Sequence, residues 1–144
     1  MRRALFYGLM AAAGSAAWML LEFVLGLHTT RAEVGRFTGF GGMVFPIAAI
    51  VLVLRDARRA RGHLGFVSGL RIGAMTGLSY AIITGAAVWW YFAWVNPGFQ
   101  VDGRSVDVTS QVTLAVVAGL VVCLAVTLIS LALLRRPRAV GVLR

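Results

Sequence analysis

Glycine or alanine occupies every fourth position of one long apolar stretch: Gly65, Gly69, Gly73, Gly77, Ala81 and Gly85. Residues four apart stack on one side of a helix, so the row forms a ridge without bulky side chains. In water each interior glycine would cost a helix roughly 1 kcal/mol relative to alanine. Between membrane helices, by contrast, small residues permit the close backbone approach on which association depends. The pattern predicts a membrane helix that packs against a neighbour through these five glycines.

The composition also indicates an integral membrane protein. Of the 144 residues, 60% are hydrophobic and only 13% are charged, whereas soluble domains carry about 25% charged residues. The mean hydropathy is +0.86. Since no change of composition divides the chain, we expect residues 1–144 to form a single membrane domain.

Four apolar runs predict four membrane-spanning helices, at approximately residues 4–27, 38–54, 72–95 and 112–134. A helix needs about 20 apolar residues to cross the hydrocarbon core, so each run is long enough, the second only narrowly. The first run is longer than the apolar region of a signal peptide, and we expect it to be retained as a span. The predicted fold class is an all-α integral membrane protein, a four-transmembrane-helix bundle.

Local patterns predict how these spans begin and are joined. Pro46 lacks an N–H group, so it should kink the second helix, and a neighbouring helix should cover the freed carbonyl. We expect residues 55–71 to be a basic loop whose last part, residues 65–71, lies along the membrane surface. Asp102-Gly103 favours a tight hairpin turn. Thr109 or Ser110 is the expected cap of the last helix.

Arginine supplies all 14 of the basic residues, and its distribution predicts the orientation. Four spans put both termini on one side, and all the arginines lie there except Arg31, Arg36 and Arg104. By the positive-inside rule both termini are cytoplasmic, in a multi-pass protein of the bacterial cytoplasmic (inner) membrane. Because the charges adjoin hydrophobic helices, we expect them to contact membrane lipids and not nucleic acid. The candidate lipid-headgroup residues are Arg58, Arg59 and Arg71.

Glu22 is the acidic residue inside a predicted span. A carboxylate within a membrane is costly and marks a functional hypothesis, here the binding of a proton, a cation or a substrate. Trp18 lies one turn away on the same face, where its ring offers a cation–π surface, and Tyr80 brings a hydroxyl to the middle of the third span. The alternative is structural, because Glu22 is only five residues from the end of its span and can pair with His28, Arg31 or Arg36.

The sequence contains no pattern for a metal, a cofactor or catalysis. Cys123 is the single cysteine, and His28 and His63 fall on opposite sides of the predicted membrane. Neither a nucleophile elbow nor a phosphate-binding or dinucleotide-binding glycine loop is present. We therefore expect no metal site, no cofactor and no enzymatic activity.

Scattered residues over the first two thirds of the chain are similar to a bacterial family. They are Trp18, Glu22, Gly26, His28, Thr38, Gly39, Pro46, Gly73, Asn96, Pro97 and Phe99. At these positions the chain resembles the family catalogued as domain of unknown function 4199, small four-helix membrane proteins. The resemblance implies the topology and no activity. Many members have a longer charged segment after Asn-Pro, whereas residues 100–110 are short here.

Two functions remain open from the sequence. The first is a non-enzymatic structural or interaction bundle that packs against lipid, against a second copy of itself as a homodimer, or against another membrane protein. The alternative is a small proton- or cation-coupled transporter or channel that uses Glu22. The sequence does not decide whether the glycine row packs within one chain or between two.

Overall fold

Four long helices form the molecule in the computed structural model, which describes residues 1–28, 34, 37–101, 104–105 and 107–134. They are α1 (Arg2–Val24), α3 (Val44–Arg61), α4 (Phe66–Trp90) and α5 (Val108–Leu134). A 3₁₀ turn, η1 (Gly39–Met43), precedes α3, and a π-helical turn, η2 (Tyr91–Val95), follows α4. Four helical segments are each long and apolar enough to cross a membrane: α1, η1 with α3, α4 with η2, and α5. The predicted all-α fold with four membrane helices is confirmed.

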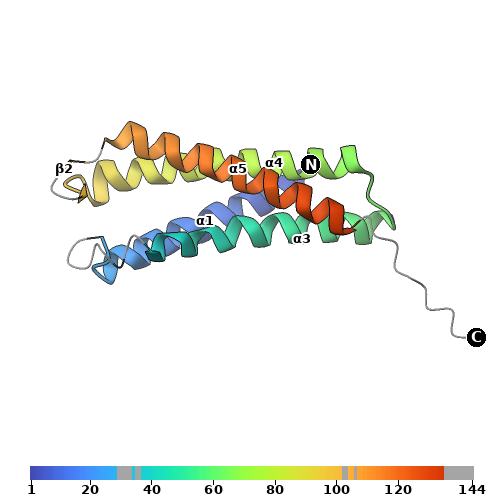
Figure 1. The fold of residues 1–144 in the computed structure, drawn as a ribbon, viewed down its shortest axis with the longest axis horizontal. Helices are drawn as coiled ribbons and strands as arrows, with labels where there is room; N and C mark the ends of the chain where they lie inside the picture. The colour runs from blue at the N-terminus through green and yellow to red at the C-terminus, as the bar shows by residue number, and fades with distance from the viewer. Residues whose placement is uncertain (29–33, 35–36, 102–103, 106, 135–144) are drawn as a thin grey trace, which may run out of the picture.

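The helices run lengthwise side by side, with α1 and α3 forming one pair and α4 and α5 the other (Figure 1). The most extensive contacts join α4 to α5 and to α1. α3 contacts all three other helices, whereas α1 and α5 are not among the closely packed pairs of the described chain. The space between α1 and α5 is therefore the central axis of the bundle.

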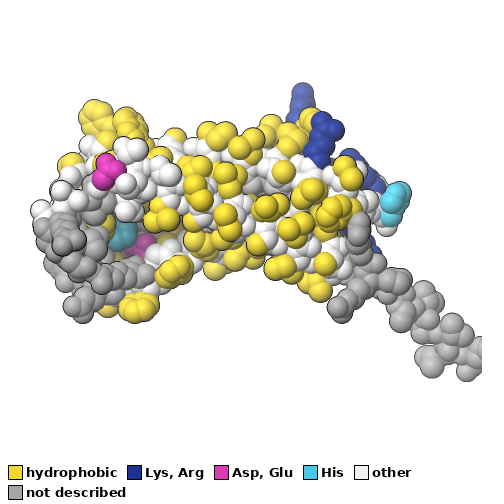
Figure 2. Space-filling view, turned by 45° about the horizontal axis from the view of Figure 1, so that its top comes forward, with side chains coloured by type: hydrophobic (Ala, Val, Ile, Leu, Met, Phe, Trp, Pro, Cys, Tyr) yellow, Lys and Arg dark blue, Asp and Glu magenta, His cyan; other side chains and the backbone are white. Residues whose placement is uncertain are grey.

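The two ends of the bundle differ in charge. The arginine side chains that the structure describes gather at one end, coloured dark blue in Figure 2. We call this the arginine end; it contains the start of α1, the end of α3 and the start of α4. The opposite end contains Glu22, the turns η1 and η2 and a short hairpin, and we call it the hairpin end. In the hairpin, β1 (Gln100–Val101) pairs antiparallel with β2 (Arg104–Ser105). The predicted hairpin is thus confirmed, although its turn at 102–103 lies outside the described residues.

Helix boundaries differ from the expected spans at the arginine end. The expected loop at 55–71 is mostly helical, because α3 continues to Arg61 and α4 already begins at Phe66. Arginines in the last turn favour a helix through its negative C-terminal dipole, and their aliphatic stems can lie along apolar surface. Gly62 then ends α3 with φ of 73°, a left-handed conformation that side chains disfavour.

The start of α5 also differs from the expectation. The helix begins at Val108, and its cap is Asp107, not Thr109 or Ser110. The Asp107 carboxylate accepts hydrogen bonds from the Ser110 N–H at 2.9 Å and the Ser110 hydroxyl at 2.7 Å. An aspartate at this position accepts hydrogen bonds from N–H groups that the first helical turn leaves unpaired. The helix can therefore begin at Val108, four residues before the predicted start at Val112.

Pro46 lies in the first turn of α3, where a missing N–H costs no bond within the α-helix. The irregular backbone is confined to the preceding turn η1. The carbonyl four residues before Pro46 belongs to Gly42, and it accepts a hydrogen bond from Ser15 Oγ of α1 at 3.0 Å. A neighbouring helix thus covers the freed carbonyl as predicted, while the expected kink becomes a 3₁₀ turn.

The glycine row of α4 faces α5 of the same chain. A Cβ atom built on Gly77 would lie 2.7 Å from Cys123 Cβ, and one on Gly73 would lie 2.9 Å from Thr127 Cβ. Gly69 meets Leu131 and Gly85 meets Val116 in the same way. Gly65 differs, because it precedes α4 and nothing lies within 4 Å of its Cβ position. It therefore takes no part in this packing, contrary to the prediction.

The core fills the bundle axis at the arginine end. Ile50, Leu54 and Leu131 are buried there, and small residues of α1 such as Ala11 and Ala12 complete the cluster. Because these side chains come from α1, α3 and α5, they occupy the space that separates the diagonal pair α1 and α5. At the hairpin end the described side chains, among them the buried Tyr91, leave a cavity in which the candidate site lies.

Candidate functional site

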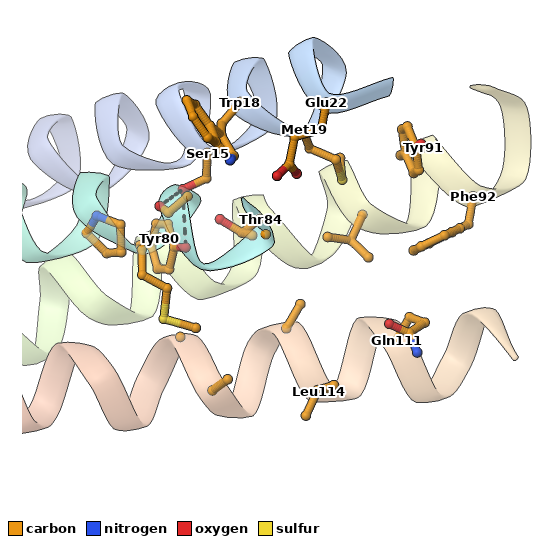
Figure 3. A pocket seen from close by; sticks show the side chains of 18 of the residues that line it. Ser15, Trp18, Met19, Glu22, Tyr80, Thr84, Tyr91, Phe92, Gln111 and Leu114 are labelled. Atoms are coloured by element: carbon orange, nitrogen blue, oxygen red, sulfur yellow. Dashed lines mark hydrogen bonds between the residues drawn. The ribbon is translucent and has the colours of Figure 1, made fainter. Parts of the chain in front are cut away.

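A cavity of about 360 Å³ occupies the bundle axis at the hairpin end. Side chains of α1, including Ser15, Met19 and Glu22, point across it toward α5 (Figure 3). On α5 the facing positions carry small residues, Ala115, Ala118 and Gly119, which leave the space open. The other lining residues are Trp18, His28, Gly39, Gly42, Met43, Pro46, Tyr80, Thr84, Val88, Tyr91, Phe92, Phe99, Gln111, Leu114 and Val122.

Glu22 lies in the wall of this cavity and is only 3% exposed. The end of α1 explains why it has a partner. Gly26 has φ of 73°, its N–H bonds the Phe23 carbonyl, and the Leu27 N–H bonds the Glu22 carbonyl. This pair of bonds is the Schellman motif, in which a left-handed residue turns the chain back over the last helical turn. His28 follows the turn, and its Nε2 lies 3.4 Å from Oε2 of Glu22.

A chain of polar groups holds His28 in place. The side-chain amide of Asn96 donates to the Tyr91 hydroxyl at 3.4 Å, and that hydroxyl lies 2.6 Å from Nδ1 of His28. When Tyr91 donates to Nδ1, the imidazole proton is on Nε2 and faces the Glu22 carboxylate. Burial lowers the pKa of His28 below its usual 6.5, against the opposing effect of Glu22. His28 is therefore neutral at pH 7, and it orients one oxygen of Glu22 without neutralising the charge.

The π-helical turn η2 positions Tyr91 for this role. Its closing bond runs from the Asn96 N–H to the Tyr91 carbonyl at 2.9 Å, five residues apart instead of four. Such turns are frequent at functional sites because they redirect side chains within a helix. The Tyr91 ring is fully buried and contacts Phe23, Phe92 and His28 edge-on.

Two buried oxygens of the cavity wall have no hydrogen-bond partner. Among the described residues, Glu22 Oε1 and Thr84 Oγ1 are the buried side-chain polar atoms without one. Both residues line this same cavity. A buried polar atom without a partner costs about 1–3 kcal/mol, so such atoms are rare and call for an explanation. The cavity is therefore a place where a ligand with a hydrogen-bond donor or a positive charge would be stabilised.

Trp18 and Tyr80, the other two predicted site residues, line the cavity and also bind neighbouring elements. Trp18 Nε1 donates to the Thr38 carbonyl at 3.0 Å, and its ring occupies the space left by the missing side chain of Gly41. The Tyr80 hydroxyl lies 3.3 Å from Ser15 Oγ. Because the single proton of Ser15 goes to the Gly42 carbonyl, Tyr80 is the donor to Ser15. The structure thus brings Trp18, Glu22 and Tyr80 together around one space.

The candidate lipid-binding arginines lie at the other end of the molecule. Arg58 and Arg59, with Arg55, border a hollow of about 400 Å³ beside Leu134. Arg71 borders a separate hollow with Arg61. None of these arginines lines the cavity that contains Glu22. No group of three or more His, Cys, Asp or Glu side chains that could hold a metal is found in the described part of the chain.

Several contacts of the site were not predicted from the sequence. Neither Tyr91 nor Ser15 was among the predicted site residues. Both had a weak signal, since Ser15 is the one serine in the first apolar run and Tyr91 the one hydroxyl in residues 89–94. Of the partners considered for Glu22, His28 is confirmed, whereas Arg31 and Arg36 lie outside the described residues.

Most of the residues on which the family resemblance depends gather at this end, Gly73 being an exception. Trp18, Glu22, His28, Pro46 and Phe99 all line the cavity, although they are spread over 82 positions of the sequence. A family model described as "Protein of unknown function (DUF4199)" matches residues 6–102. No curated protein and no solved structure matches the chain.

Proposed function

Since this chain belongs to the DUF4199 family, whose function is unknown, we propose a function from the geometry of its own cavity. The protein is a small carrier that exchanges a cation for protons across the membrane, and Glu22 is the carboxylate that holds either of them. Its action is non-enzymatic.

One observation supports this proposal above the others. Glu22 is buried, and one of its carboxylate oxygens has no partner among the described residues. Glu22 also lines a cavity that extends to Ser15 and Tyr80, near the middle of their helices. A carboxylate that only stabilised the fold would be expected to have both oxygens satisfied, because a buried unpaired charge is destabilising. An oxygen left free inside a cavity is what reversible binding requires.

The charge distribution supports the orientation in which this carrier would work. With the arginine end in the cytoplasm, both termini are cytoplasmic and the cavity lies near the outer face. In a bacterial inner membrane that side is the more acidic and supplies protons. Arg58, Arg59 and Arg71 would then lie near the inner anionic headgroups, each attracted by about 1 kcal/mol.

The alternative is a structural bundle that acts by packing against lipid, a second copy or another membrane protein. The contact between His28 and Glu22 favours it, because that contact gives the carboxylate one partner without any ligand. Under this alternative the cavity is a packing defect and Glu22 carries no ion.

A flux measurement separates the two functions. Purified protein is reconstituted into liposomes with an acidic interior that contain a pH-sensitive dye. Sodium, potassium or trimethyl(2-phenylethyl)ammonium chloride is then added outside, because the quaternary ammonium has no uncharged form that could cross the bilayer and collapse the gradient without the protein. The wild type should collapse the pH gradient with at least one of these cations, and Glu22→Gln should not, because the amide cannot exchange a proton.

Asp107→Asn is the matched control for this measurement. It removes one carboxylate at the same end of the bundle but outside the cavity, and asparagine preserves the helix cap. This variant should carry cations as the wild type does. A wild type without flux for any probe, or a Glu22→Gln protein with unchanged flux, would leave only the structural bundle.

A further inference from the structure

The charge of the cavity defines the sign of its ligand. Among the described residues, Glu22 is the carboxylate in its wall, His28 is the basic residue, and no arginine or lysine lines the cavity. Because burial lowers the pKa of His28, the imidazole is neutral at pH 7 and does not compensate the carboxylate. Of the two carboxylate oxygens, Oε2 faces His28 and Oε1 has no partner. A single positive charge beside Oε1 would therefore balance the site.

The buried, unpartnered oxygens in the described wall of the cavity are too few to hold a metal cation by themselves. Hard cations such as magnesium and calcium take six to eight oxygen ligands, about 2.0–2.6 Å away. Among the described residues, the buried side-chain oxygens without a partner are Glu22 Oε1 and Thr84 Oγ1, while the hydroxyls of Ser15 and Tyr80 are bonded to each other. An ammonium group needs fewer partners, since it donates up to three hydrogen bonds and is also attracted by aromatic rings.

Apart from Gln111, most of the remaining described wall of the cavity is apolar or aromatic. Trp18, Phe92 and Phe99 contribute rings, and Met19, Val88 and Leu114 contribute aliphatic surface. Such a wall stabilises the hydrophobic body of a ligand and offers nothing to a hydrated ion. Its volume of about 360 Å³ lies at the lower end of the 300–1,000 Å³ typical of small-molecule sites.

We infer that the cavity binds a small organic monocation, an amine with an apolar or aromatic body, whose ammonium group contacts Glu22 Oε1 and the Thr84 hydroxyl. This inference rests on the proposed function, because it names the substrate of the same carrier. The apolar body lies between the rings of α1 and η2 and the small residues of α5. Sodium, potassium and divalent metals are poor ligands.

Binding is measured separately from transport, in lipid nanodiscs. Trp18 lines the cavity, whereas Trp89, Trp90 and Trp94 do not. Replacing those three with phenylalanine leaves Trp18 as the single tryptophan, because the chain has four. Its fluorescence is followed during titration with 2-phenylethylammonium, with the uncharged 2-phenylethanol, and with sodium chloride. The ammonium should give a saturable change in fluorescence, with a dissociation constant lower than that of the alcohol by roughly tenfold or more. The reason is that only the ammonium can form a charge contact with Glu22 inside the cavity.

Two variants and one control locate the binding at the cavity. Glu22→Gln should weaken binding of the ammonium to the level of the alcohol, and Asp107→Asn should leave it unchanged. Ala118→Leu fills the cavity without touching the carboxylate and should abolish binding of both organic probes. If Glu22→Gln fails to fold, Ala118→Leu alone tests whether the ligand binds in the cavity, because retained ammonium binding in that variant would place the ligand elsewhere.

The outcomes separate this inference from the proposed function. Ammonium binding that depends on Glu22, in a protein without cation flux, supports the ligand class and removes the carrier. Sodium-driven flux without ammonium binding supports the carrier and overturns the ligand class. Equal affinity for 2-phenylethylammonium and 2-phenylethanol also overturns it, because the cavity would then select apolar bodies and not charge.

Discussion

The axis of the bundle is filled at the arginine end and open at the hairpin end. In the first region it is occupied by Ile50, Leu54 and Leu131, whose side chains are at most 1% exposed. In the second region the facing positions of α5 are small, and the wall contains a carboxylate and hydroxyls around a cavity of about 360 Å³. The first region buries apolar side chains against one another, whereas the second contains two buried polar atoms without a partner among the described residues.

This difference indicates how stability and binding are divided along the helices. Apolar packing and the glycine contacts between α4 and α5 hold one region together. Residues that bind ligands are typically less stable than the scaffold that carries them. The comparison can be tested with substitutions that should act differently at the two ends.

The largest effect is expected for Gly73→Leu in the packed region. Because a Cβ at this position already lies 2.9 Å from Thr127 Cβ, a leucine must force α4 and α5 apart. Overpacking of this kind should lower the free energy of unfolding by roughly 3 kcal/mol. Thermal unfolding in detergent, followed by circular dichroism, measures it. Ile82→Leu on the exposed side of α4 is the matched control, and an equal midpoint for both variants would mean that the α4–α5 contact is loose.

Gly26→Ala should have the next largest effect, at the hairpin end. Alanine at φ of 73° strains the backbone by about 1–2 kcal/mol, and the Schellman turn should shift to relieve it. His28 then leaves Glu22, so a lower melting temperature should accompany altered cation binding. Gly98→Ala is the control, since nothing lies within 4 Å of its Cβ position and its φ is not positive. An unchanged Gly26→Ala protein would show that the turn does not position His28.

Ala118→Leu should act in the opposite direction to Gly73→Leu, although both add a bulky side chain to a helix interface. Its side chain would enter the open cavity, and filling a cavity typically stabilises a protein by about 1 kcal/mol. The melting temperature should rise while binding of organic cations is lost. A destabilised Ala118→Leu protein would indicate that the hairpin end is as tightly packed as the arginine end.

The smallest effect concerns the cap of α5 and depends on pH. Hydrogen bonds from the Ser110 hydroxyl and the Ser110 and Thr109 N–H groups lower the pKa of Asp107 below its usual 3.8. The stabilisation of the folded protein by the Asp107 carboxylate is therefore complete above pH 3.8, and it is lost as the pH falls through the lower pKa that Asp107 has in the folded state. Melting temperatures of the wild type and Asp107→Asn should converge as the pH is lowered below 3.8. Parallel curves over the whole range would show that Asp107 does not titrate with folding.

Much of the fold was predictable because lipid imposes simple rules on a sequence. Apolar runs of sufficient length predicted the four helices, and Asp102-Gly103 predicted the hairpin that Gln100 and Ser105 form. Boundaries were less predictable, since α3 continues through a basic segment that reads as a loop. Asp107 was missed as a cap because the helix was expected to begin only at the apolar residues.

The candidate site was predicted in part. Glu22, Trp18 and Tyr80 were identified by residue type and span, and all three line the cavity. The hydrogen bond between Tyr91 and His28 joins residues 63 positions apart, and no local pattern indicates such a pair. The lack of a hydrogen-bond partner for Glu22 Oε1 could not be predicted either, because it depends on the positions of all the side chains around that oxygen.

The sequence alone determined that four apolar helices would form and that a carboxylate would lie among them, because helix formation and membrane burial depend on local composition. Only the tertiary structure decided that the axis is filled at one end and hollow at the other. It also decided which oxygen of Glu22 is held by His28. Those features arise where side chains from different helices meet, and their distances depend on how the whole bundle packs.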